Sequence, residues 1–117
     1  MSNRERLLQE LEAKGRRLHG ELYLPVAEAR SLIERCLAMD LAVSAVELFE
    51  WQGEERAPVL LVSDDFSLID DADWRRYQER CAAAARAVLA QVAAGPQVYV
   101  NVVLLERSRW KAAPPGF

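Results

Sequence analysis

The sequence predicts an α+β fold in which an N-terminal helix precedes a ferredoxin-like antiparallel sheet of order βαββαβ, with the helices on one face. Two observations predict this class. Three segments place apolar residues at helical spacing, and the stretches between them are short apolar or alternating runs bounded by turn-forming residues. Because 117 residues suit one domain, we expect a single domain over residues 1–106 and a flexible tail over residues 107–117.

Three helices are expected in chain order. Ser2 and Glu5 have the spacing of a capping box, and the leucines that follow predict an accessory helix within residues 1–18. An amphipathic segment over residues 26–39 begins directly after a proline, which suits the first turn of a helix. Asp73 and the aspartates before it suit the N-terminus of the longest helix, which a Gly-Pro pair is expected to end.

Four strands are expected around these helices. The second and third strands form a hairpin, and the all-apolar run of the third favours a central strand that is covered on both faces. The last strand alternates, and its second face is half apolar, so we expect the N-terminal helix or a second subunit to cover that face. The predicted strands are residues 21–24, 41–51, 59–62 and 97–106.

The cysteines and the start of the chain indicate the compartment. Cys36 and Cys81 lie far apart with no Cys-x-x-Cys pair, so we expect two reduced, buried thiols in a cytoplasmic protein. The charged N-terminus lacks the apolar core of a signal peptide, and no apolar run is long enough for a transmembrane helix. His19 is the one histidine, so no site that needs several histidines is expected, and it is interpreted as a cap or surface residue.

The charge is unevenly distributed along the chain. A formal net charge of −3 argues against a general nucleic-acid binder. That total combines +1 over residues 1–38, −9 over residues 39–73 and +5 over residues 74–117. The acidic segment has two interpretations. Its carboxylates either cap helices, form turns and keep the protein in solution, or they form a negative surface that docks a basic partner.

Motifs for catalysis or for cofactor binding are missing from the sequence. It contains no Gly-rich phosphate loop, no nucleophile elbow and no zinc-protease motif, so we expect neither an enzyme nor a bound cofactor. The acidic stretch over residues 64–71 lacks the spacing and the central glycine of an EF-hand, so no metal site is expected.

Three aromatic residues have two interpretations each. Trp51 at the hairpin tip is either a partly exposed interface anchor or a residue that folds back over the edge of the sheet. Phe66 is either a loop anchor in the core or a partner contact, and Trp110 is either a clasp on the domain or part of a disordered end.

Four short stretches of the sequence carry a resemblance to a known group of proteins: Ala45–Glu50, Ser63–Asp65, Asp73-Trp74 with Tyr77, and the valine-rich last strand. Together they resemble small bacterial immunity proteins of polymorphic toxin systems. The resemblance implies a compact cytoplasmic domain that neutralises a cognate toxin by occluding it, without catalysis. The implied contact surface for a basic toxin domain is Glu50, Trp51, Glu54, Glu55, Asp64, Asp65 and Phe66.

Two other functions remain open from the sequence. A ferredoxin-like small-ligand-binding or regulatory module would dimerise through the open sheet face, with Tyr99, Val103 and Leu105 in the interface. An enzyme of the dimeric α+β barrel type would need a pocket between the helices and the sheet. The sequence does not decide between a monomer and a homodimer.

Overall fold

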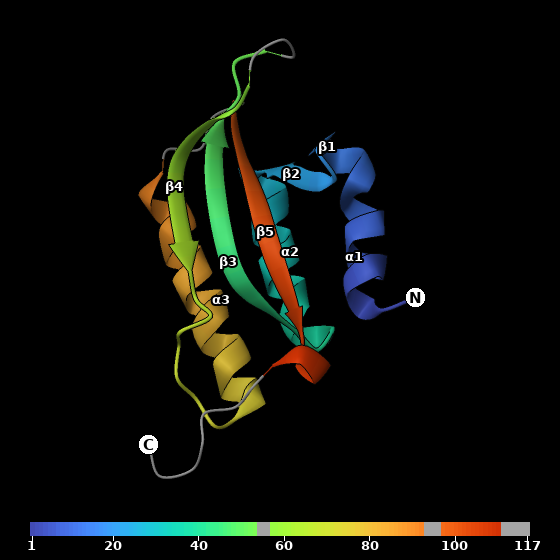
Figure 1. Ribbon diagram of the computed structural model, residues 1–117, viewed down its shortest axis with the longest axis vertical. Helices are drawn as coiled ribbons and strands as arrows, with labels where there is room; N and C mark the ends of the chain where they lie inside the picture. Colours follow the sequence, from blue (N-terminus) through green and yellow to red (C-terminus); the bar gives the residue numbers. More distant parts are fainter. Residues whose placement is uncertain (54–56, 93–96, 111–117) are drawn as a thin grey trace.

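A five-stranded antiparallel sheet and two helices on one of its faces form the body of the structure (Figure 1). The computed structural model describes residues 1–53, 57–92 and 97–110. The strands are β1 (Arg16–Leu18), β2 (Glu21–Pro25), β3 (Leu41–Glu50), β4 (Val59–Asp65) and β5 (Val98–Glu106). The helices are α1 (Asn3–Leu11), α2 (Val26–Ala38) and α3 (Trp74–Gln91), with short 3₁₀ helices η1 (Glu12–Lys14) and η2 (Arg107–Arg109).

The order of the strands across the sheet is β1-β2-β5-β3-β4, so β5 and β3 lie at the centre. From β2 onward the chain follows the expected succession βαββαβ, which confirms the α+β class. The order across the sheet is not the ferredoxin-like one. The two longest strands, β3 and β5, pair from Leu41–Glu106 to Glu50–Val98, and the shorter β2 and β4 flank them.

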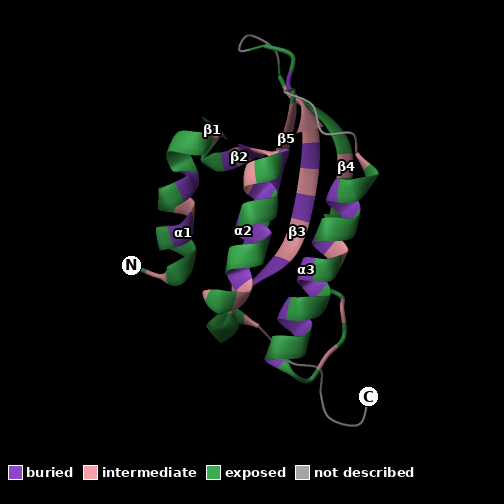
Figure 2. Ribbon diagram, turned by 180° about the vertical axis from the view of Figure 1, so that it is seen from behind, coloured by how far each residue is buried: buried purple, intermediate pink, exposed green. Residues whose placement is uncertain are grey.

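The prediction of a central third strand was wrong, because β4 lies at the edge of the sheet. Figure 2 shows that β3 consists of buried and half-buried residues, whereas β4 is exposed at every residue except Val62. An apolar run indicates a strand with side chains that can be buried. It does not determine which strand of the sheet pairs with another strand on both sides. Here β5 takes the place beside β3, and β4 pairs with β3 alone within residues 1–53, 57–92 and 97–110.

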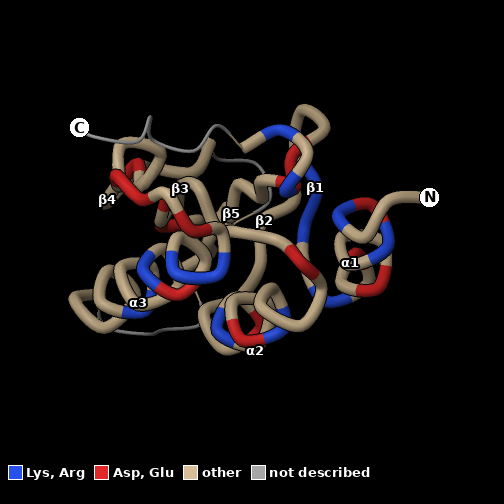
Figure 3. The backbone as a smooth tube through the Cα atoms, turned by 90° about the horizontal axis from the view of Figure 1, so that it is seen from below, with Lys and Arg blue, Asp and Glu red and all other residues tan. Residues whose placement is uncertain are grey.

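The core lies between the sheet and the helices α2 and α3, which both cover the same face of the sheet (Figure 3). Alternate residues of the two central strands point into it, among them Val46 and Leu48 of β3 and Val100 of β5, all fully buried. Ile33 of α2 and Leu89 of α3 belong to the same buried cluster. Burial of this apolar surface is the main favourable contribution to folding.

The N-terminal segment is a helix followed by a strand, not one long helix. The Ser2 side chain accepts a hydrogen bond from the backbone N–H of Glu5 at 3.1 Å, which confirms the predicted cap. The predicted helix ends early, at Leu11, and after η1 the chain is extended at Gly15, where a Cβ would lie 2.5 Å from the carbonyl oxygen of Tyr23. This close approach lets Arg16 pair with Tyr23, and β1 forms there.

The helix α1 packs beside α2 and does not cover the outer sheet face. Glu10 and Arg35 form an ion pair of 2.7 Å, and the Asn3 side chain donates to the Met39 carbonyl at 2.9 Å. On the face of the sheet away from the helices, Val103 keeps 40% of its surface exposed. The expectation that the accessory helix covers this face was therefore wrong.

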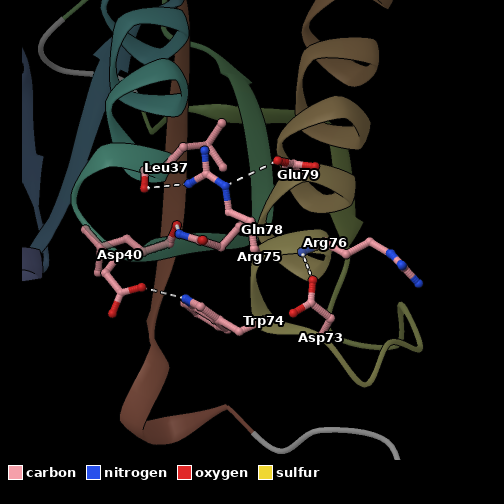
Figure 4. A network of polar contacts seen from close by, with 9 residues as sticks. Leu37, Asp40, Asp73, Trp74, Arg75, Arg76, Gln78 and Glu79 are labelled. Atoms are coloured by element: carbon pink, nitrogen blue, oxygen red, sulfur yellow. Dashed lines mark hydrogen bonds and ion pairs between the residues drawn. The ribbon is translucent and has the colours of Figure 1, made fainter.

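A set of polar contacts ties the ends of α2 and α3 to the start of β3 (Figure 4). Asp40 adopts a left-handed backbone with φ of 57° and accepts a hydrogen bond from the Trp74 indole at 2.7 Å. The buried Gln78 side chain donates to the Leu41 carbonyl at 2.9 Å. Asp73 caps α3, as predicted, by accepting the N–H of the residue three positions later at 3.0 Å. These acidic residues have structural roles.

The two thiols and Trp110 complete the packing. Cys36 and Cys81 are free and buried, as predicted, and burial raises the pKa of Cys36 to about 12.

Trp110 lies against Trp74 and Tyr77, with ring centroids 5.3 Å and 5.4 Å apart. Residues 107–110 are therefore not the start of a loose tail, and the interpretation of Trp110 as a clasp is the one that the structure shows.

We predict that Trp110→Ala lowers the free energy of unfolding by about 1–3 kcal/mol, because it removes two aromatic contacts worth about 0.5–1.5 kcal/mol each. Urea denaturation measures the change. The control is Leu68→Ala, which truncates a side chain that is 90% exposed and is expected to change stability by less than about 0.5 kcal/mol. Equal stabilities of the two variants would contradict the clasp.

Candidate functional site

The free edge strand β4 exposes three consecutive apolar side chains. Val59, Leu60 and Leu61 keep 63%, 50% and 42% of their surface in contact with solvent. The pairing with β3 passes from Leu48–Val62 to Phe49–Leu60, so Leu61 is the extra residue of a β-bulge. Neighbouring exposed apolar residues of this kind mark interaction sites more often than single ones do.

Carboxylates surround these apolar side chains. Glu50 pairs with Val59 across the two strands, Glu47 pairs with Ser63, and Asp64 and Asp65 end β4. We call this set the β4 patch: Glu47, Glu50, Val59, Leu60, Leu61, Asp64 and Asp65. The patch therefore combines an apolar centre with an acidic margin.

The acids of the β4 patch have no cationic partner among the residues that the structure describes. Hydrogen bonds from the side chain and backbone of Ser67 lower the pKa of Asp65, whose Oδ1 accepts the Ser67 N–H at 2.8 Å. Glu50 accepts a hydrogen bond from the Gln52 side chain. By contrast, Asp71 outside the patch pairs with Arg80 at 3.4 Å. The acidic segment thus divides into structural acids and acids that are not charge-paired.

A small hollow adjoins the patch where β3 ends and β4 begins. It has a volume of about 150 Å³ and is lined by Glu50, Gln52, Ala57 and Val59. This volume lies below the range of about 300–1,000 Å³ that is typical of small-molecule sites. The hollow has room for a side chain of a partner protein.

A second feature occupies the outer face of the sheet, where aromatic rings from three strands and the residue after β3 meet. Tyr23 packs edge-on against Phe49 at 5.3 Å and against Trp51 at 5.5 Å, and Trp51 packs against Tyr99 at 5.8 Å. The Arg16 guanidinium lies 5.1 Å from the ring centroids of both Trp51 and Tyr99. These contacts hold β1 against the sheet.

Trp51 is folded back into this aromatic cluster and is only 8% exposed. Its backbone N–H donates to the Gln97 carbonyl at 2.8 Å, while its buried indole N–H finds no acceptor within the described ranges. The structure thus shows the second interpretation of Trp51, a residue folded over the sheet. Phe49 and Trp51 are two residues apart, so their shared face is readable from the sequence, but Tyr23 and Arg16 reach it only through the sheet order.

The predicted contact residues are only partly brought together. Glu50, Asp64 and Asp65 lie in the β4 patch, whereas Glu54 and Glu55 fall outside the described residues. Phe66 is 5% exposed, and its N–H donates to the Ser44 carbonyl at 2.7 Å, so it anchors its loop in the core. The exposed apolar residues of β4 were missed as contact residues, because their run was interpreted as a buried central strand.

The described parts of the chain hold no group of three or more His, Cys, Asp or Glu residues placed to bind a metal ion. Within the same parts, no helix has the length and apolar character needed to cross a membrane. Comparison of the chain with protein-family models, curated proteins and solved structures finds no match.

We predict that Glu47→Gln lowers the pKa of Tyr23. Burial, Glu21 and Glu47 together raise that pKa, because each disfavours the phenolate, and the substitution removes one of the two charges. Nuclear magnetic resonance of ring-labelled tyrosine follows the titration. The control Glu50→Gln alters the paired neighbour of Val59 and should leave the Tyr23 pKa unchanged; an equal fall in both variants would contradict the assignment.

Proposed function

We propose that this chain is a non-catalytic binding protein of the immunity type, which neutralises a basic toxin domain by covering it with the β4 patch. The observation that carries the proposal is the conjunction of exposed Val59, Leu60 and Leu61 with acids that lack a cationic partner in the described chain. Protein interfaces commonly combine an apolar centre with a polar rim.

The charge of the patch supports a basic partner. Residues 39–73 carry a formal charge of −9, and Glu47, Glu50 and Asp64 lie along β4 and its neighbour β3 without an ion-pair partner among the described residues. Such a surface attracts a cationic protein over several ångströms and accelerates its association by about 10- to 1,000-fold at low salt. The apolar side chains then contribute to holding the complex together.

The arrangement of the acids suits docking better than acid–base catalysis. Glu47 pairs with Ser63 on the outer face of the sheet, whereas Asp64 pairs with Val46, whose buried side chain points toward the helices. Two carboxylates on opposite faces of a sheet do not approach one substrate atom together. Occlusion of a partner is therefore favoured over turnover of a substrate.

A second candidate, the dimeric ligand-binding or regulatory module, is favoured by one observation. Val103 is 40% exposed on the outer sheet face, and none of the three described helices lies over that face. In that case two copies would meet through Val103 and Leu105. The acids of the β4 patch would then lie outside the dimer interface.

Affinity capture tests the proposed function. The chain is immobilised and exposed to a lysate of its source organism, and retained proteins are identified by mass spectrometry. We expect a basic protein that binds the unmodified chain and whose toxicity is suppressed when the two are co-expressed. The absence of any such protein would contradict the proposal.

We predict that Asp64→Lys slows association with the captured partner by about tenfold at low salt, because it reverses a charge within the steering surface. The control Glu5→Lys changes the net charge equally on α1, away from β4, and should have little effect. Stopped-flow or biosensor rates at two salt concentrations measure both. Equal slowing by the two variants would show that overall charge, and not the β4 patch, guides the encounter.

A further inference from the structure

Resting on the proposed function, we infer that the basic partner binds by adding a strand to the free edge of β4. The partner segment has an apolar half and a basic half. It pairs antiparallel with residues 62–65 of β4 and places its apolar half over Leu60 and Leu61. The interface between the two proteins is then a continuation of the sheet.

The two edges of the sheet differ in a way that supports this inference. The β1 edge has three residues, of which Arg16 and Arg17 are charged. Short strands and charges are the means by which proteins prevent unwanted strand pairing at an edge. The β4 edge has seven residues, pairs only with β3 in the described structure, and begins with apolar side chains. It is the edge that is open to another strand.

The bulge at Leu61 decides where pairing occurs. A β-bulge is another means of preventing strand pairing at a sheet edge. This bulge interrupts the regular hydrogen-bonded pairing between Leu60 and Val62. Beyond it, Val62 to Asp65 pair regularly with β3, so their outer backbone groups form a regular template of four residues. An added strand therefore pairs with this run, while the exposed Leu60 and Leu61 contact its apolar end.

The side chains of that run specify the partner. Val62 and Asp64 face the helix side, and Ser63 and Asp65 face the open side, since successive residues alternate. An antiparallel segment meets Asp65 and Asp64 first and Leu60 last. The sequence of the partner segment therefore starts with two cationic residues, one opposite Asp65 on the open side of the sheet and one opposite Asp64 on the helix side. It continues with β-branched or aliphatic residues.

Charge complementarity selects a basic partner over a second copy of this chain. Two copies paired through β4 would bring the patch acids Glu47, Glu50, Asp64 and Asp65 of both chains to one shared edge. Repulsion between them opposes that dimer, whereas a basic segment neutralises Asp64 and Asp65. The same acids that steer the encounter thus select the strand that is added.

A peptide titration of the full chain tests the inference. The probe is the acetylated, amidated hexapeptide Lys-Lys-Thr-Val-Leu-Val, added to the isotope-labelled chain and followed by the amide signals of residues 59–65. We predict saturable binding that slows hydrogen exchange in this run. Methylation of alternate backbone nitrogens of the peptide, on its pairing edge, should weaken binding at least tenfold, because those groups can no longer donate.

Matched variants locate the contact. Leu61→Lys should weaken binding of the probe at least tenfold, and Leu60→Lys provides a second test if the first variant unfolds. The control is Val103→Lys, because Val103 has an exposure of 40%, close to the 42% of Leu61, but lies on β5. It should bind the probe as the unmodified chain does.

Four results would overturn strand addition at β4 by a basic partner. They are no binding of the probe at millimolar concentration, undiminished binding of the methylated peptide, loss of binding in Val103→Lys alone, and a dimer of the free chain that Leu61→Lys dissolves. None of these requires the captured toxin. If capture succeeds and any of them occurs, the partner binds the protein in another way. If capture fails, the proposed function fails independently.

Discussion

The pairing of β3 with β5 is the interaction on which the rest of the molecule depends. The ladder joins two strands that are distant in sequence, and it provides the surface on which α2 and α3 pack. Val46, Leu48 and Val100, which are fully buried, line that surface. With β5 inserted beside β3, β2 is placed on one flank and β4 on the other.

The candidate site follows from this placement. A hairpin strand in the middle of a sheet would bury its apolar residues on both faces. Because β5 takes that position, Val59, Leu60 and Leu61 stay exposed at the edge, next to Glu50 and Asp64. The opposite edge is closed by the short charged strand β1, which the contacts of Arg16 with the aromatic cluster hold in place. One edge is thus protected, and the other carries the features of a contact surface.

The local elements could be predicted from the sequence, since their signals are local. The caps at Ser2 and Asp73, the amphipathic α2 and the alternation of β5 all depend on neighbours within a few residues. The strand β1 was missed because its three residues, Arg16 to Leu18, show no apolar alternation, and it pairs with β2 where Gly15 allows a close approach. Strand order is decided by contacts distant in sequence, which no local pattern reports.

The site could be predicted only in its charge. The excess of acids over residues 39–73 is visible in the sequence, but the structure separates Asp40, Asp71 and Asp73, which have hydrogen-bonding roles, from Glu47 and Asp64. The apolar half of the patch was hidden, because exposed and buried runs of valine and leucine look the same in sequence. Trp51 shows the converse: expected as an exposed anchor in one interpretation, it packs among Tyr23, Tyr99 and Arg16.

Amide hydrogen exchange of the chain, free and bound to the basic protein that it captures, tests the central claim most directly. If β4 is the contact edge, the amides of residues 59–65 become protected on binding, while those of β1 and of the outer face around Val103 keep their free rates. Protection confined to β1 or to the outer sheet face, with β4 unchanged, would contradict the account.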